Sequence, residues 1–146
     1  MAILATLASP EVRVRRQISS ILASIASIEI PRGEWDELIP SLCSNAESTE
    51  TNIKLASLTT LGYVCDEIKP SDINDAVKNA IIAALTKNIT SEPENLESTR
   101  LAIKALPNSI PYASQSFQNS QERDFIMEKI FVACSIADEE VREHGL

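Results

Sequence analysis

The stretch NIKLASLTTLGYVCDEI, residues 52–68, decides the fold of this 146-residue chain. Its largely apolar positions form two rows at helical spacing: Leu55, Leu58, Leu61, Cys65 and Ile68, and Ile53, Ala56, Thr60 and Val64. Between Lys54 and Asp66 the stretch carries no charge. A helix that is apolar nearly all round needs neighbours on both flanks, so we expect it to lie between two other helices. Gly62 costs about 1 kcal/mol relative to Ala in a helix interior, which indicates a close backbone approach there.

The composition favours helices packed on helices. The chain is 44% hydrophobic but only 4% aromatic, and much of the apolar content is Ala, Ile and Leu. The net charge of −8 disfavours nucleic acid or an anionic membrane surface as a partner and favours basic protein surfaces. We expect Arg13, Arg15 and Arg16, which cluster in the first helix, to lie on a solvated face.

The sequence carries neither a membrane-spanning run nor the start of a secretory signal. No uninterrupted apolar run reaches the ~18 residues that a bilayer requires, and the first residues contain no basic region. Cys43, Cys65 and Cys134 are odd in number and show no C-x-x-C spacing. We therefore expect a soluble intracellular protein without membrane insertion, with its cysteines as small core residues in a reducing compartment.

The chain contains few residues of the types that catalyse reactions. His144 is the only histidine, which disfavours His-rich metal sites and most base-activated nucleophiles. Three glycines cannot supply a phosphate-binding loop, and the paired acids fall at predicted helix ends. We predict that the protein is not an enzyme and needs no cofactor or metal.

Prolines and helix caps divide the chain into a succession of helices joined by short turns. The predicted helices cover residues 9–28, 34–45, 52–68, 72–89, 96–106 and 121–136, with a last one beginning at 138. Ser9 and Pro10 are predicted to begin the first helix, Ser120 to cap the helix at 121, Pro40 to kink the second helix, and Pro107 to end or kink the fifth. Residues 112–119 read as a polar linker.

The helices repeat at a fixed period. Leu38, Ile82 and Ile126 stand 44 residues apart in alternate helices, and Ile53 and Val141 stand 88 apart, which is two such periods. Paired helices recurring every 40–47 residues are typical of HEAT and armadillo units. The sequence therefore predicts one all-α array over residues 1–146, an α-solenoid of HEAT repeats whose antiparallel helix pairs recur about every 40–45 residues. The predicted units are 1–30 (partial), 34–68, 72–110 and 120–146 (partial).

The helix at 121–136 has more apolar surface than one core face requires. On a wheel of about 100° per residue its core side is formed by Met127, Ile130, Phe131 and Cys134. Phe125 points away from that side, and is either covered by a neighbouring repeat or open to a partner. The helices that contain Leu38, Ile82 and Ile126 are expected to form the outer layer of the array. In the outer helix at 72–89 the apolar arc is widened by Ile81, Ile82 and Leu85. We expect these two outer helices to flank a shallow apolar groove.

Three stretches resemble the importin-β family of nuclear transport receptors. They are IEIPRGEWDELIP (28–40), NIKLASLTTLGYVCDEI (52–68) and SQERDFIMEKIFVACSIADEEVR (120–142), and the likeness extends over residues 9–142. It implies an early-to-middle piece of a longer solenoid found in the cytoplasm and nucleus and at the nuclear pore and nuclear envelope. The implied partners are Phe-Gly nucleoporins and, for the full-length protein, a Ran-type GTPase and cargo or an importin-α-like adaptor.

The family's main Phe-Gly peptide pocket lies between neighbouring outer helices. The resemblance places it here at Ile81, Ile82 and Leu85 on one helix and at Glu122, Phe125 and Ile126 on the next. The helical wheel leads to the same groove without the resemblance. The alternative function is a HEAT-repeat scaffold of another multiprotein complex, similar to the scaffold subunit of a phosphatase.

Overall fold

Six α-helices and no strand make up the residues that the computed structural model describes, which are 11–90, 92–114 and 116–143. The helices are α2 (Val12–Glu29), α3 (Leu38–Asn45), α4 (Thr51–Glu67), α5 (Asp75–Lys87), α6 (Leu96–Ser109) and α7 (Ser120–Glu143). The predicted all-α fold is confirmed.

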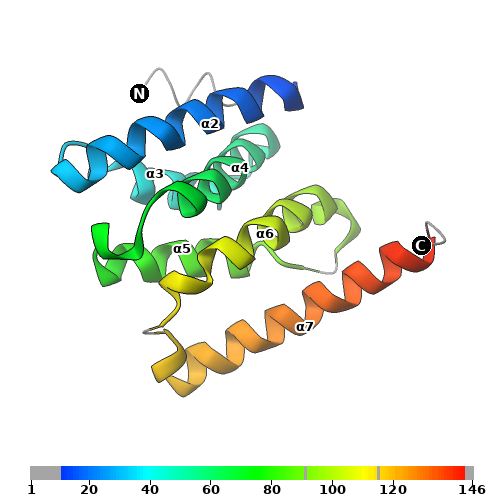
Figure 1. Cartoon of the computed structure of the whole chain (residues 1–146). Helices are drawn as coiled ribbons and strands as arrows, with labels where there is room; N and C mark the ends of the chain where they lie inside the picture. Colours follow the sequence, from blue (N-terminus) through cyan, green and yellow to red (C-terminus); the bar gives the residue numbers. More distant parts are fainter. Residues whose placement is uncertain (1–10, 91, 115, 144–146) are drawn as a thin grey trace.

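The helices are arranged in two layers (Figure 1). Helices α2, α4 and α6 lie side by side and run in the same direction, while α3 and α5 lie behind them. Helix α7 runs antiparallel to α6 at the end of the stack. The chain alternates between the layers: α2 is followed by α3, α4 by α5 and α6 by α7.

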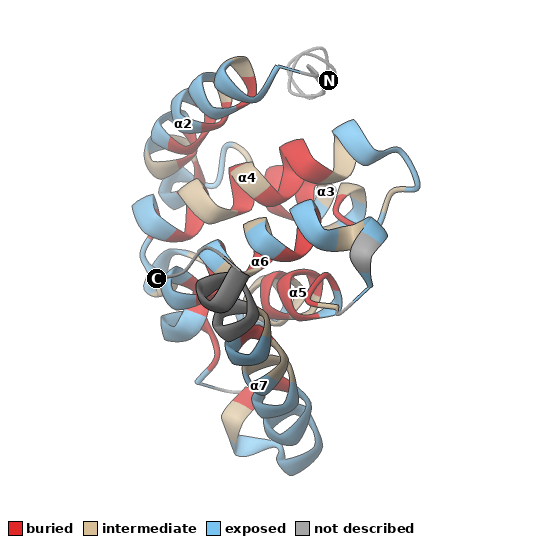
Figure 2. Ribbon diagram, turned by 90° about the vertical axis from the view of Figure 1, so that its right-hand side faces the viewer, coloured by how far each residue is buried: buried red, intermediate tan, exposed pale blue. Residues whose placement is uncertain are grey.

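Helix α4 has neighbours on both flanks, as its sequence predicts. Eight of its residues are buried, and Leu58 and Leu61 have no exposed surface at all. Figure 2 shows this burial along α4 between α2 and α6. A methyl group added at Gly62 would lie 3.4 Å from the Cβ of Ala105 on α6, so the expected close approach is present. That distance is ordinary van der Waals contact, so α6 comes close without requiring a glycine.

Polar side chains also join α4 to its neighbours. The Thr60 hydroxyl donates to the Ala56 carbonyl at 2.8 Å and lies 2.9 Å from the Ser19 hydroxyl of α2, which is therefore free to donate to it. Both hydroxyls are buried and satisfied, which explains a threonine in an apolar row. The expectation for Arg15 was wrong: its side chain is buried and its guanidinium lies 3.7 Å from the carboxylate of Glu97 on α6.

Several predicted helix boundaries are corrected. Helix α3 begins at Leu38, so Pro40 lies in its first turn, where the missing N–H has no intrahelical partner and causes no kink. Helix α6 contains Pro107 and continues to Ser109. The proline is tolerated because it lies in the last turn, where its missing N–H costs the helix one hydrogen bond. Helix α7 continues without a break past residue 138, so no separate helix begins there. Ser9 and Pro10 lie outside the described residues, and α2 begins at residue 12.

The segment read as a polar linker is a packed connection. It contains the 3₁₀ turns Ile110–Tyr112 and Ser116–Gln118. Tyr112 is buried, and its hydroxyl donates to the carbonyls of Ile68 and Cys65 at the end of α4. Asn119, not Ser120, caps α7, because its side-chain oxygen accepts from the N–H of Gln121 at 3.0 Å. The connection thus fixes where α7 starts.

Replacing the central leucine tests whether α4 carries the core. Leu61→Ala removes a side chain with no exposed surface, and we expect it to lower the free energy of unfolding by about 2–5 kcal/mol. Urea denaturation followed by circular dichroism measures the change. A loss below about 1 kcal/mol would show that α4 is rotated away from this packing.

Candidate functional site

A groove of about 360 Å³ lies between α5 and the first turns of α7. Helix α5 contributes one stripe at helical spacing: Asn79, Ile82, Ala83, Thr86 and Lys87. Helix α7 contributes a second stripe: Gln121, Glu122, Phe125 and Ile126. We call this site the α5–α7 groove. Two stripes that face each other form a linear site of the kind that takes an extended peptide.

The floor of the α5–α7 groove is continuous with the hydrophobic core. Ile82 and Ile126 are 4% and 2% exposed and belong to the same buried cluster. Because these side chains are packed from below, the two helices cannot separate without exposing core surface. The floor is therefore rigid and preformed, which lowers the entropic cost of binding.

Phe125 forms the wall of the groove. Its side chain is 42% exposed, although it is large and aromatic. The Lys129 ammonium lies 5.4 Å from the centroid of the Phe125 ring and also donates a hydrogen bond to the Ile89 carbonyl at 3.0 Å. A cation held over an aromatic face stabilises that ring orientation. Lys129 thus holds an open aromatic surface in place.

Polar groups lie at the edges of the groove rather than on its floor. The Ser116 hydroxyl donates to the side-chain oxygen of Asn79 at 3.2 Å. The Thr86 hydroxyl donates to the Ile82 carbonyl at 2.7 Å and is already satisfied. Glu122 is exposed at the rim, where its carboxylate is available to accept hydrogen bonds. Lys87, whose ammonium donates to the Glu47 carboxylate at 2.9 Å, and Gln121 also line the groove. The groove therefore offers an apolar bed with acceptors and donors beside it.

The structure brings together four of the six residues predicted for this site. Ile82, Glu122, Phe125 and Ile126 line the groove. Ile81 and Leu85 have no exposed surface and lie in the core, so the expectation that they line the groove is corrected. The residues that were missed are Asn79, Ala83, Thr86, Lys87, Ser116 and Gln121. The helical spacing of 79, 82, 83, 86 and 87 is a signal that would have found four of these six.

The predicted orientation of α7 was wrong. Its core side consists of Ile126, Ile130 and Ala133, whereas Met127 and Phe131 are 38% and 66% exposed. Both the predicted and the observed set follow helical spacing, and the positions of Met127 and Phe131 are offset by one residue from those of Ile126 and Ile130. Phe125 therefore flanks the core stripe instead of opposing it, which is why it reaches the groove.

Two of the three cysteines are protected thiols. Burial raises the pKa of Cys65 to about 12, with Cys43 adding to the effect, and burial together with the nearby Glu47 carboxylate raises the pKa of Cys43 to about 12. Cys134 is exposed, which corrects its expected place in the core. In the described part of the chain no cluster of three or more His, Cys, Asp or Glu side chains is arranged to hold a metal ion. Among the same residues no helix is long and apolar enough to cross a bilayer.

The paired helices in two layers define the class of protein: an α-solenoid of HEAT-type repeats. Importin subunit beta-1 of Arabidopsis thaliana is 33% identical over 141 residues, which cover 97% of this chain and 16% of that protein. Importin subunit beta-1 of Saccharomyces cerevisiae is 34% identical over 143 residues, with 95% and 16% covered. No protein-family profile matches the chain.

A solved structure gives the same relationship. The structure of yeast importin-beta (Kap95p) superimposes with a TM-score of 0.79 at 29% identity and covers 88% of this chain and 15% of the yeast chain. The chain belongs to the importin-β family, to which it is homologous over most of its length. It spans about one-sixth of the length of these relatives. Importin-β proteins are not enzymes, in agreement with the sequence-based prediction.

A pair of neighbouring substitutions tests the orientation of α7. Ile126→Ala should lower the free energy of unfolding by about 2–5 kcal/mol, because it opens a cavity in the core. Met127→Ala should change it by no more than about 0.5 kcal/mol, because that side chain is 38% exposed and belongs to no buried cluster of the described residues. Chemical denaturation of both variants gives the comparison. The opposite ranking would restore the orientation predicted from the wheel.

Proposed function

We propose that this chain is part of a nuclear transport receptor and that its α5–α7 groove binds Phe-Gly repeats of nucleoporins. The observation that carries the proposal is Phe125, an exposed aromatic residue held by Lys129 beside an apolar floor. Family membership supports it. A Kap95:Nup1 complex is among the solved structures similar to this chain, with a TM-score of 0.73 at 29% identity over 88% of the chain.

The groove suits a phenylalanine followed by glycine for physical reasons. A phenylalanine ring inserted over Ile82 and Ile126 buries apolar surface and meets the ring of Phe125, and aromatic pairs add about 0.5–1.5 kcal/mol beyond the area buried. The following glycine has no side chain, so the peptide backbone can approach the helix surface. The Glu122 carboxylate at the rim can accept a backbone N–H of the peptide.

The wider role is proposed for the full-length protein. We propose that it also binds a Ran-type GTPase and cargo or an importin-α-like adaptor, and that it works in the cytoplasm, the nucleus and the nuclear pore. A similar structure describes Kap95p binding to RanGDP, with a TM-score of 0.78 at 29% identity. Homology to importin subunits favours this role over a HEAT scaffold of another complex.

Removing the aromatic wall tests the proposal. Phe125→Ala should weaken binding of a Phe-Gly peptide about tenfold, because an aromatic anchor is worth ~1–2 kcal/mol or more at an interface. The side chain is only half-buried, so the variant should stay folded. A fluorescence-anisotropy titration with a labelled Phe-Ser-Phe-Gly peptide, run beside a thermal melt, measures both quantities.

Met127→Ala is the matched control, since Met127 lies on the same helix with similar exposure but outside the groove. It should leave the affinity unchanged. Equal weakening by both variants, or no binding by the unaltered chain at millimolar peptide, would refute the proposal.

A further inference from the structure

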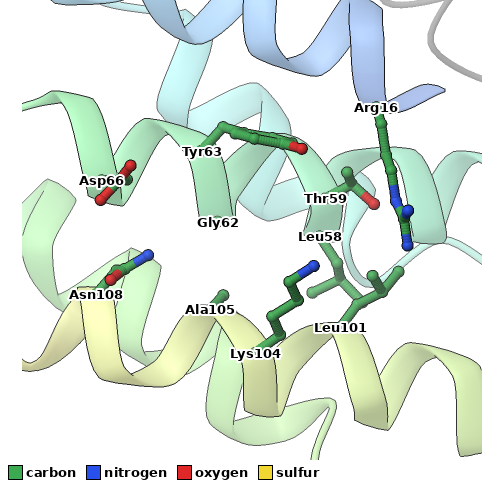
Figure 3. A pocket seen from close by; sticks show the side chains of 10 residues that line it. All are labelled: Arg16, Leu58, Thr59, Gly62, Tyr63, Asp66, Leu101, Lys104, Ala105 and Asn108. Carbon is green, nitrogen blue, oxygen red and sulfur yellow. The ribbon is translucent and has the colours of Figure 1, made fainter. Parts of the chain in front are cut away.

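A second surface of interest lies on the α2–α4–α6 layer, away from the α5–α7 groove. A hollow of about 170 Å³ opens between α4 and α6 (Figure 3). A neighbouring hollow of about 520 Å³ extends from it toward the start of α6. The two share four lining residues: Arg16, Thr59, Leu101 and Lys104. They therefore form one continuous depression, which we call the α4–α6 depression.

The first hollow exists because its floor is made of small residues. Gly62 and Ala105 face each other there, and neither fills the space above them. Leu58, Tyr63 and Leu101 provide apolar surface around this floor. A volume of about 170 Å³ has room for one aliphatic or aromatic side chain. The hollow therefore offers a place for a single apolar anchor.

The junction of the two hollows is positively charged in a protein of net charge −8. Arg16 from α2 and Lys104 from α6 both extend toward the gap between α4 and α6 (Figure 3). Both side chains are exposed, and in the described part of the chain neither makes an ion pair. Two acids, Glu94 and Glu97, line the second hollow, and Glu97 is engaged by the buried Arg15. Arg16 and Lys104 thus line both hollows, and among the described residues no acidic side chain forms an ion pair with either.

We propose that the α4–α6 depression binds an acidic linear segment of a partner protein, with one apolar side chain over Gly62 and adjacent carboxylates on Arg16 and Lys104. The guanidinium of Arg16 can hold a carboxylate through two parallel hydrogen bonds, and the ammonium of Lys104 adds a point charge. Asp66, at the far end of the hollow, sets the direction by repelling acidic residues there. A nucleic acid fits less well, because it carries a phosphate at every nucleotide, whereas a peptide segment can place its carboxylates at the two cations alone and an apolar side chain over Gly62.

The proposal does not depend on the Phe-Gly groove, because the two sites share no lining residue. Phe125→Ala should leave acidic-peptide binding unchanged, and a failure of either site can be recognised separately.

Charge reversal at the junction tests the proposal. The probe is a fluorescein-labelled nine-residue peptide with a central leucine between two runs of aspartate, titrated against the full chain. Lys104→Glu should weaken its binding at least tenfold, because an attraction becomes a repulsion. Lys69→Glu is the matched control: it makes the same change in net charge at an exposed lysine outside the depression and should weaken binding less than twofold.

Two further probes sharpen the outcome. Replacing the central leucine of the peptide by serine should weaken binding about fivefold if the apolar hollow is used. Equal weakening by Lys69→Glu, equal affinity for the serine peptide, or no binding at millimolar peptide would overturn the proposal. Tighter binding of a single-stranded oligouridylate than of the peptide would overturn it in favour of nucleic acid.

Discussion

The burial of α4 on both flanks is the constraint on which the rest of the structure depends. Leu58 and Leu61 face the core with no exposed surface, Thr60 meets Ser19 of α2 through buried hydroxyls, and Gly62 lies close to Ala105 of α6. A helix with so little polar surface is stable only when both neighbours are present. The α2–α4–α6 layer is therefore a cooperative unit, and its outward surface carries the α4–α6 depression.

The same constraint reaches the α5–α7 groove through the connection after α6. The buried Tyr112 hydroxyl holds this connection to the carbonyls at the end of α4, and Asn119 then caps α7. The start of α7 is thereby placed against α5, and Ile126 enters the core beside Ile82. Phe125, one residue earlier, is left at the surface. An exposed aromatic residue on a rigid floor is a consequence of this packing and also the basis of the proposed peptide site.

How much the sequence could predict depended on whether its patterns were unambiguous. The charge-free run around Leu61 allowed one interpretation, and the all-α fold and the central helix followed from it. Helix α7 allowed two, because the stripe of Ile126, Ile130 and Ala133 and the stripe of Met127 and Phe131 are both apolar at helical spacing. Only the neighbouring helices decide which stripe is buried, and no local pattern contains that information.

The site shows the same limit on a finer scale. Ile81 and Ile82 are adjacent in sequence and both belong to the core, yet only Ile82 also lines the groove, because consecutive helix positions differ by about 100°. The packed role of Tyr112 could not be predicted, since its partners are backbone carbonyls 44 and 47 residues away. Every residue has a backbone carbonyl, so the sequence does not indicate which carbonyl a side chain will bind.

A photo-crosslinking experiment tests the central claim, that packing around α4 leaves a preformed peptide groove between α5 and α7, most directly. A Phe-Gly peptide whose phenylalanine is replaced by benzoylphenylalanine is irradiated with the chain, and the attached residues are identified by mass spectrometry. The account predicts attachment to α5 and the first turns of α7, at Ile82, Thr86 or Phe125. Attachment concentrated on α2, α4 and α6, or scattered over the surface without preference, would contradict it.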